Sequence, residues 1–236
     1  PLKYYSYEWV HVDSPDRRGI DVVLFYDPAK LDLLEVRTVQ PDLVKLGGGK
    51  TRDILLCLFR WDQDSLLLVA NHWPSKYGGV GLTDRYRLEA AKTVRSLTDP
   101  FLSANPDANI IVFGDLNDES NSGSVRHLKE SRESIRGLTG LEGMGERVYG
   151  TLKYQGRWMV YDQYLVSPSL MQEAGIYLSE PYFRIYDPDF LLTEDDRYGG
   201  VKPFRTWEGY RYAGGYSDHL PVILDLHKDR SAGRGK

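Results

Sequence analysis

Histidine, aspartate and asparagine residues gather in four short segments, each of which combines an expected strand with polar residues at its C-terminal end. The segments are 71–74 (NHWP), 114–117 (GDLN), 161–163 (YDQ) and 217–221 (SDHLP). Carboxylate and amide oxygens are the ligands that hard cations such as Mg²⁺ prefer. Histidine is the side chain that most readily exchanges a proton near neutral pH. These residue types together suit metal-assisted hydrolysis.

Each segment alone has a simpler explanation. Gly-Asp-x-Asn after a strand is a common turn stabilised by its own side chains. A single histidine such as His72 or His219 is more often structural than catalytic. Asp162 differs, because it lies inside an apolar run. A buried carboxylate without a partner is strongly unfavourable, so Asp162 requires a stabilising neighbour.

Apolar patterning predicts the elements that must position these segments. Apolar residues recur at helical spacing from Thr83, the expected N-cap, to Leu102. Strand 31–39 is expected to pair with 20–26, and 54–59 to form a hairpin with 66–70. Further strands are expected at 110–113, 148–153, 159–166 and 220–226. Many strands with few helices favour an α+β fold with two facing sheets.

Composition indicates one globular domain over residues 1–236, with a disordered tail at 230–236. The net charge is −4, without the basic excess typical of a dedicated nucleic-acid binder, which favours a small phosphorylated substrate. The sequence holds one cysteine, no signal peptide and no apolar run long enough to span a bilayer. The localisation is left unknown, with export or the periplasm slightly favoured over the cytoplasm.

Taken in order, the polar segments resemble signatures of the endonuclease/exonuclease/phosphatase superfamily, which includes DNase I, abasic-site endonucleases, neutral sphingomyelinases and inositol polyphosphate 5-phosphatases. The matching segments are GDLND at 114–118, YDQYLVS at 161–167 and SDHLPV at 217–222. NHWPSK at 71–76 and RGIDVVLFY at 18–26 resemble a bacterial branch of uncharacterised members. The resemblance implies a DNase I-like fold, a two-layer β-sandwich flanked by helices in four α/β/β/α layers.

The resemblance also implies roles at the centre of the site. Asp115 would orient or deprotonate the attacking water, and Asn117 would contact the phosphate or the metal. Asp162 would hydrogen-bond His219, which would touch the scissile phosphate. Asp218 would bind the metal or support its ligands. The implied cofactor is Mg²⁺ or Mn²⁺, held by Asp115, Asn117 and Asp218.

Further catalytic and substrate contacts are expected around this centre. His72 resembles a second catalytic histidine near the leaving group, and Asn71 is expected to bind substrate. Arg52 resembles an arginine that holds substrate phosphate. A surface arginine at the start of a strand is an equal alternative for Arg52.

The loop 182–216 is rich in aromatic and basic residues, and Arg205 and Trp207 are its expected substrate contacts. The alternative is a loop that packs its aromatic rings over a sheet. Three functions stay open. The first is a hydrolase acting on a phosphorylated small molecule or lipid head group. The second is a nuclease that stacks on bases, and the third is an inactive module that recognises a phosphorylated partner.

The resemblance fails at the N-terminal end. Family members begin with a strand ending in Asn, then a helix, then a strand ending in a metal-binding Glu, and nothing before Arg18 matches them. Glu8 lacks a preceding apolar strand and is not assigned that role. We therefore expect the N-terminal strand–helix–strand to be missing, by truncation or in a natural inactive remnant, with truncation favoured. The resulting exposed sheet edge is expected to allow self-association.

Overall fold

The computed structural model describes residues 6–77, 79–132 and 135–229. The expected disordered tail at 230–236 lies outside these residues. Among them, no helix is both long enough and apolar enough to cross a membrane.

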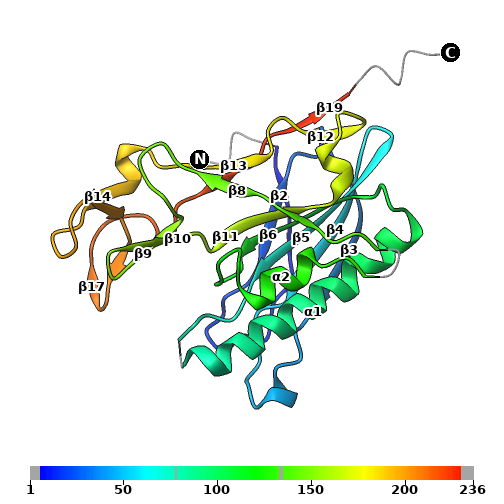
Figure 1. Cartoon of the computed structure of the whole chain (residues 1–236). Coiled ribbons are helices and arrows are strands. Elements are labelled where there is room, and N and C mark those ends of the chain that lie inside the picture. The colour runs from blue at the N-terminus through cyan, green and yellow to red at the C-terminus, as the bar shows by residue number, and fades with distance from the viewer. Residues whose placement is uncertain (1–5, 78, 133–134, 230–236) are drawn as a thin grey trace.

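A six-stranded sheet with the order β3-β4-β5-β6-β11-β7 forms the centre of the molecule (Figure 1). Strands β5 and β6 are parallel, and the other neighbours are antiparallel. The expected β4–β5 hairpin is present, and Asp62 turns it with a positive φ of 55°. The strands are β3 (Asp32–Val39), β4 (Ile54–Trp61), β5 (Asp64–His72), β6 (Asn109–Asp115), β7 (Thr139–Gly140) and β11 (Asp162–Val166).

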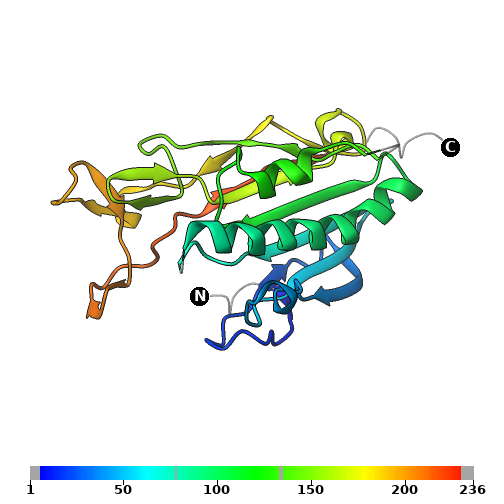
Figure 2. The ribbon, with the colours of Figure 1, turned by 60° about the horizontal axis from the view of Figure 1, so that its bottom comes forward.

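Helices α1 (Val80–Ala104) and α2 (Gly123–Lys129) cover the same face of this sheet (Figure 2). Side chains alternate along a strand, so every second residue faces the helices. Leu56 of β4, Val69 of β5 and Val112 of β6 pack there against Val94 of α1. The sheet and the two helices therefore share one apolar core.

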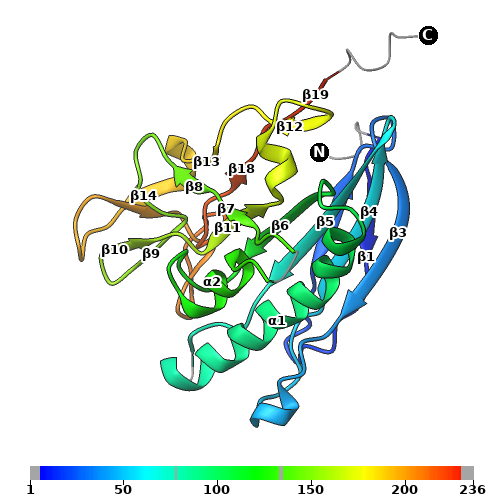
Figure 3. The same ribbon diagram turned by 45° about the vertical axis from the view of Figure 1, so that its right-hand side comes forward.

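The opposite face of the central sheet packs against a second, discontinuous β layer (Figure 3). The intervening strand residues, such as Cys57 and Ile111, point into this second core. The structure is thus the expected α+β sandwich, with its described helices on one outer face. The second layer consists of β1 (Glu8–His11) with β2 (Val23–Tyr26), β8 (Glu142–Met144) with β13 (Tyr182–Ile185) and β18 (Val222–Ile223), and β12 (Ile176–Leu178) with β19 (Leu226–Lys228).

Short hairpins and 3-10 turns complete the chain, and the hairpins gather at one end of the sandwich (Figure 1). The hairpins are β9 (Leu152–Tyr154) with β10 (Arg157–Met159), β14 (Leu192–Glu194) with β15 (Val201–Pro203), and β16 (Trp207–Glu208) with β17 (Arg211–Tyr212). The 3-10 turns are η2 (Val44–Leu46), η3 (Pro168–Met171) and η4 (Asp189–Leu191).

Several sequence predictions about pairing and boundaries are wrong. Segment 31–39 does not pair with 20–26: β2 pairs with β1, and β3 crosses to the other layer to pair with β4. Segment 159–166 divides, because β10 closes a hairpin with β9 while β11 joins the central sheet. The expected last strand also divides, into β18 and β19.

The helix starts were also mispredicted. Thr83 is not the N-cap, which is Gly79, and its hydroxyl donates instead to the Gly79 carbonyl at 3.0 Å. Helix α2 was not expected, since only seven residues carry too little periodicity. Its N-cap is Ser122, whose hydroxyl accepts the Val125 N–H at 3.3 Å.

The β1–β2 hairpin presents apolar side chains to solvent. Trp9 and Phe25 lie opposite each other in register and are 65% and 54% exposed. Within the described residues, β1 and β2 pair only with each other, so each keeps a free edge. We therefore expect the protein to self-associate in sedimentation velocity. Phe25→Lys should shift it toward a 27.0 kDa monomer.

The matched control is Tyr210→Lys, which alters a fully exposed ring on the far hairpin. A wild-type protein that sediments as a monomer at all concentrations contradicts this prediction.

Candidate active site

Three neighbouring strands bring candidate catalytic side chains to one edge of the central sheet. His72 ends β5, Asp115 ends β6 and Asp162 begins β11. The strand register sets His72 opposite Asp115 and Asp115 opposite Asp162. His219 reaches the same edge from the loop that precedes β18, so both β layers contribute to the site.

The polar atoms of these residues lie close together. His219 Nδ1 is 2.7 Å from Asp162 Oδ2, and His72 Nε2 is 3.6 Å from Asp115 Oδ2. Ligand atoms of Asp115, Asp162 and His219 all lie within 4.8 Å of one another. The four residues therefore form one continuous polar cluster, which we call the central cluster.

The charge of His219 is set by its acidic neighbours. Burial alone would lower the pKa of His219, but the hydrogen bond and charge of Asp162, with the charges of Asp115 and Asp218, outweigh it and raise the pKa to about 9. Because the His219 Nδ1–H donates to the Asp162 carboxylate, the Nε2–H of the same ring is left to donate elsewhere. His219 is thus a protonated donor at neutral pH.

The pKa values of Asp115 and His72 are both shifted so that the neutral form of each side chain is favoured. Burial, together with the charge of Asp162, raises the pKa of Asp115 to about 6, against the opposing influence of His219. Burial, followed by the charges of Arg52 and Arg18, lowers the pKa of His72 to about 4. At neutral pH, His72 is therefore neutral, and Asp115 is a carboxylate close to its titration range.

The turn after β6 fixes the Asp115 side chain. The Asn117 backbone N–H donates to Asp115 Oδ1 at 2.8 Å, and the Asn117 amide donates to Oδ2 at 3.0 Å. Asn117 has a positive φ of 50°, a conformation that asparagine tolerates well. Gly114 has a φ of 122°, and a Cβ there would lie 2.1 Å from the Asn71 carbonyl oxygen. Only glycine fits at that position.

Asn71 was expected to bind substrate, but its side chain is used inside the protein. The residue is 4% exposed, and its amide donates to the Val69 carbonyl at 2.8 Å. Its Oδ1 accepts the Trp73 indole N–H at 2.9 Å. This arrangement favours a role for Asn71 in holding the 71–74 segment, and leaves no polar group of its side chain free toward substrate.

Arg52 is also committed to internal contacts. Its guanidinium donates to Asp16 at 3.1 Å and to the carbonyls of His72 and Trp73 at 3.1 and 2.6 Å. Side-chain exposures of 3% for Arg52 and 6% for Asp16 make this a buried ion pair. The contacts favour neither the expected phosphate role nor the alternative of a surface arginine: Arg52 supports the backbone at His72.

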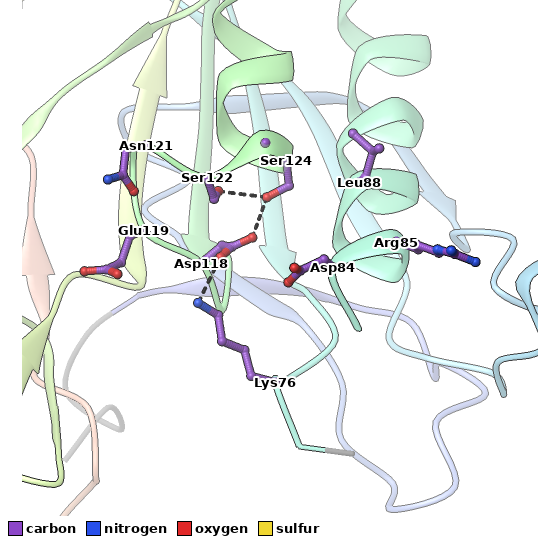
Figure 4. Close-up of a pocket in the computed structure, with 10 residues that line it drawn as sticks. Lys76, Asp84, Arg85, Leu88, Asp118, Glu119, Asn121, Ser122 and Ser124 are labelled. Atoms are coloured by element: carbon purple, nitrogen blue, oxygen red, sulfur yellow. Dashed lines mark hydrogen bonds and ion pairs between the residues drawn. The ribbon is translucent and has the colours of Figure 1, made fainter. Parts of the chain in front are cut away.

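A buried polar network that the sequence analysis did not identify lies next to Asn117. Asp118 accepts from Lys76 at 3.0 Å, Arg87 at 3.0 Å and Ser124 at 2.6 Å. In Figure 4, Lys76 and Ser124 point at Asp118 from opposite sides, while Arg85 points away. The network ties the catalytic turn to α1 and α2. Asp118 is the last residue of the GDLND segment, but its burial and its three partners are visible only in the fold.

Asp218, Arg205 and Trp207 lie at the outer side of the site. Asp218 is largely exposed, and its Oδ2 is 3.4 Å from the Arg205 guanidinium. This contact joins the hairpin segment to the loop that carries His219. Trp207 is 55% exposed and packs edge-on against Tyr212 in its own hairpin, at 5.3 Å between ring centroids. The structure therefore brings Arg205, but not Trp207, into contact with the expected site residues.

The central cluster has a suitable donor set for a divalent cation. Asp115 and Asp162 are adjacent carboxylates in a partly buried position, and their mutual repulsion contributes to the raised pKa of Asp115. A hard cation would relieve that repulsion. Asp115 and Asp162 supply the carboxylate oxygens that such a cation prefers, while His219 Nδ1 is already bonded to Asp162.

Comparison with known proteins gives a family and a fold. The model of the Endonuclease/Exonuclease/phosphatase family matches residues 1–228. Enzymes of this family generally hydrolyse phosphoesters and are typically dependent on divalent metals. No curated protein matches the sequence significantly.

Three solved structures with this fold come from differently named proteins. The catalytic domain of human nocturnin with bound sulfate has a TM-score of 0.59 and 13% identity, covering 94% of this chain and 73% of that one. A mannosyl-6-phosphatase of Bacteroides thetaiotaomicron has a TM-score of 0.57 and 15% identity, covering 94% of this chain and 77% of that one. A truncated TDP2 of Caenorhabditis elegans has a TM-score of 0.58 and 13% identity, covering 97% of this chain and 77% of that one. At such low sequence identity, the structural similarity establishes a shared fold, the DNase I-like fold.

The Asp162–His219 pair makes a prediction for the metal-free protein. Asp162→Asn removes the largest of the contributions that outweigh burial, so the pKa of His219 should fall from about 9 toward the ordinary histidine range. An NMR titration of the histidine ring signals measures this shift. Because the folded pKa is raised, the wild-type pair stabilises the protein fully below pH 6.5 and loses this contribution as the pH rises through about 9. An unshifted His219 in the variant would contradict the assignment.

Gly114→Ala should destabilise the protein by more than about 2 kcal/mol, because it adds both backbone strain and a clash with Asn71. Urea unfolding gives the free energy of unfolding. Gly123→Ala is the control, since nothing lies within 4 Å of its added Cβ on α2. Equal stabilities of the two variants would show that the Gly114 turn is not tightly constrained.

Proposed function

We propose that this chain, which belongs to the endonuclease/exonuclease/phosphatase family, hydrolyses a phosphate ester with a divalent cation, Mg²⁺ or Mn²⁺, at the central cluster. The observation that carries the proposal is the convergence of Asp115, Asp162 and His219 within 4.8 Å. Their protonation states are complementary, since a carboxylate near its titration range lies beside a protonated histidine.

Asp115 is suited to act as the general base. A carboxylate fixed beside a water molecule can accept a proton from it, and burial makes Asp115 more basic than an exposed aspartate in the metal-free protein. Two hydrogen bonds from Asn117 hold the carboxylate in place, so it can orient a water molecule toward phosphorus. As the water oxygen bonds to phosphorus, its proton passes to an oxygen of Asp115. The ester P–O bond breaks, and the departing alkoxide takes a proton from solvent.

His219 is suited to stabilise the charge that develops on the phosphoryl oxygens. Its Nε2–H is available because Asp162 accepts at Nδ1. A charged donor that is already oriented needs no reorganisation during the reaction. Neutral His72, beside Asp115, is positioned to hydrogen-bond an ester oxygen.

The cation would be held by Asp115 and Asp162, with Asn117 and Asp218 as the further ligands that the family resemblance implies. When bound, it supplies positive charge to the phosphoryl group and lowers the pKa of water. The bound sulfate of human nocturnin is an analogue of phosphate in a protein of the same fold. It supports an anion-binding role for this fold.

The substrate is a phosphorylated small molecule, a lipid head group or a nucleic acid. Proteins of the same fold carry names as different as mannosyl-6-phosphatase and TDP2. Arg205, which contacts Asp218, is the residue of the hairpin region best placed to meet a substrate. A net charge of −4 favours a small substrate over a long nucleic acid.

Hydrolysis of bis(p-nitrophenyl) phosphate and p-nitrophenyl phosphate with Mg²⁺ or Mn²⁺ tests the proposal. Asp115→Asn and His219→Ala should each lower kcat/KM by at least about 100-fold, as expected for loss of a general base or of an oriented charged donor. EDTA should abolish the activity. Circular dichroism verifies that each variant is folded.

Asp107→Asn is the matched control, because it makes the same change in the turn before β6, at the other end of the strand from Asp115. It should keep the wild-type rate. A wild-type protein that binds phosphate esters with metal but turns none over would instead establish an inactive recognition module.

A further inference from the structure

A groove with unusual charge lies beside the central cluster. The β1–β2 loop and the β3–β4 loop meet there at one end of the sandwich (Figure 3), and they enclose an open pocket of about 580 Å³ with the segment that follows β5. Among the described residues that line it, four are cationic and one is acidic. The cations are Arg17, Arg18, Lys50 and Arg52, and the acid is Asp16. We call this site the basic groove.

The single carboxylate does not neutralise the groove. Asp16 is shared between Arg18 and Arg52, with contacts of 3.1 to 3.2 Å. Neither Arg17 nor Lys50 has an ion pair or a side-chain hydrogen bond within the described part of the chain, and both are exposed. The groove therefore keeps a positive charge in a protein whose net charge is −4, which suits an anionic ligand.

The base of the groove is rigidly coupled to the candidate active site. The buried Asp16–Arg52 ion pair forms its base, and Arg52 also binds the carbonyls of His72 and Trp73. An anion that contacts Arg52 in the groove would therefore be separated from His72 of the central cluster by this one side chain.

The glycine loop leaves bare backbone at the rim of the groove. Gly47 has a φ of 80°, and Gly48 packs against the Tyr86 ring, where a Cβ would lie 2.9 Å from a ring carbon. Gly49 has neither constraint, because its φ is ordinary and nothing lies within 4 Å of an added Cβ. Gly49 is exposed at the rim of the groove and carries no side chain that would keep a ligand away from its backbone.

We propose that the basic groove binds a second phosphate group of the substrate, one that is not hydrolysed. The inference rests on the proposed function for the location of the reacting phosphate, and it narrows the substrate class to molecules with at least two phosphates. Arg17 and Lys50 supply the charged donors, and the Gly49 backbone N–H is accessible beside them. A nucleotide chain and a bisphosphorylated polyol both carry this chemistry.

Isothermal titration calorimetry of the full chain in EDTA, where no ligand is turned over, tests the groove separately from catalysis. Two matched pairs of ligands are used: pTpT with TpT, and inositol 1,4-bisphosphate with inositol 1-phosphate. The second phosphate should tighten binding by about tenfold in at least one pair, as two charge-assisted hydrogen bonds would. The pair that responds identifies a nucleotide or a polyol substrate.

Arg17→Ala/Lys50→Ala should abolish that gain, because both residues lack other partners and their removal leaves the Asp16–Arg52 pair intact. The control variant Arg126→Ala/Arg136→Ala removes the same charge from exposed positions on and after α2, and should retain the gain in affinity from the second phosphate. The inference is overturned if the second phosphate gives no gain in either pair, or if the gain persists in Arg17→Ala/Lys50→Ala. Failure of the hydrolysis assays would count against the proposed function alone.

Discussion

The hydrogen bond between Asp162 and His219 joins the two β layers at the point where the proposed chemistry takes place. Asp162 belongs to the central sheet and His219 to the loop that enters the second layer. Register is the constraint behind this contact, since a slip of one residue in β11 would turn Asp162 to the other face. The side-by-side carboxylates of Asp115 and Asp162 are tolerated because His219 carries the compensating charge.

The surrounding structure holds this arrangement in place. On one side of β6, Asn71 fixes Trp73 and leaves room only for glycine at position 114. On the helical side, Asp118 is anchored by Lys76, Arg87 and Ser124. On the side of β4, Arg52 and Asp16 support the backbone at His72. Residues that look like substrate contacts by type therefore act mainly by positioning others.

Much of the fold could be predicted from the sequence. Buried hairpins such as β4–β5 and the long helix α1 have strong local periodicity. Segments 71–74 and 114–117 were correctly placed at the C-terminal ends of strands, whereas 161–163 opens β11 and 217–221 precedes β18. Asp162 stood out because an aspartate in an apolar run needs a partner. The family resemblance supplied His219 as that partner. Local patterning could not show which strands pair across layers, so the partner of β3 was mispredicted.

The roles of Arg52 and Asn71 were beyond sequence reasoning for a related reason. A guanidinium or an amide can hydrogen-bond a substrate or the protein backbone equally well. The burial of Arg52 and Asn71, which the sequence does not show, favours the backbone. The Asp118 network escaped notice because its partners, Lys76, Arg87 and Ser124, come from three separate segments. The basic groove likewise arises from two loops that are about 30 residues apart in sequence but adjacent in the fold.

Anomalous diffraction from crystals grown with Mn²⁺ and phosphate tests the central claim most directly. The account predicts the strongest manganese peak about 2.1 Å from a carboxylate oxygen of Asp115 or Asp162, with phosphate oxygen in contact with His219 Nε2. The described part of the chain offers one competing group of potential ligands, the exposed His11 and Asp13 with the half-buried Asp21. A manganese peak at that group, with none beside Asp115, would contradict the account.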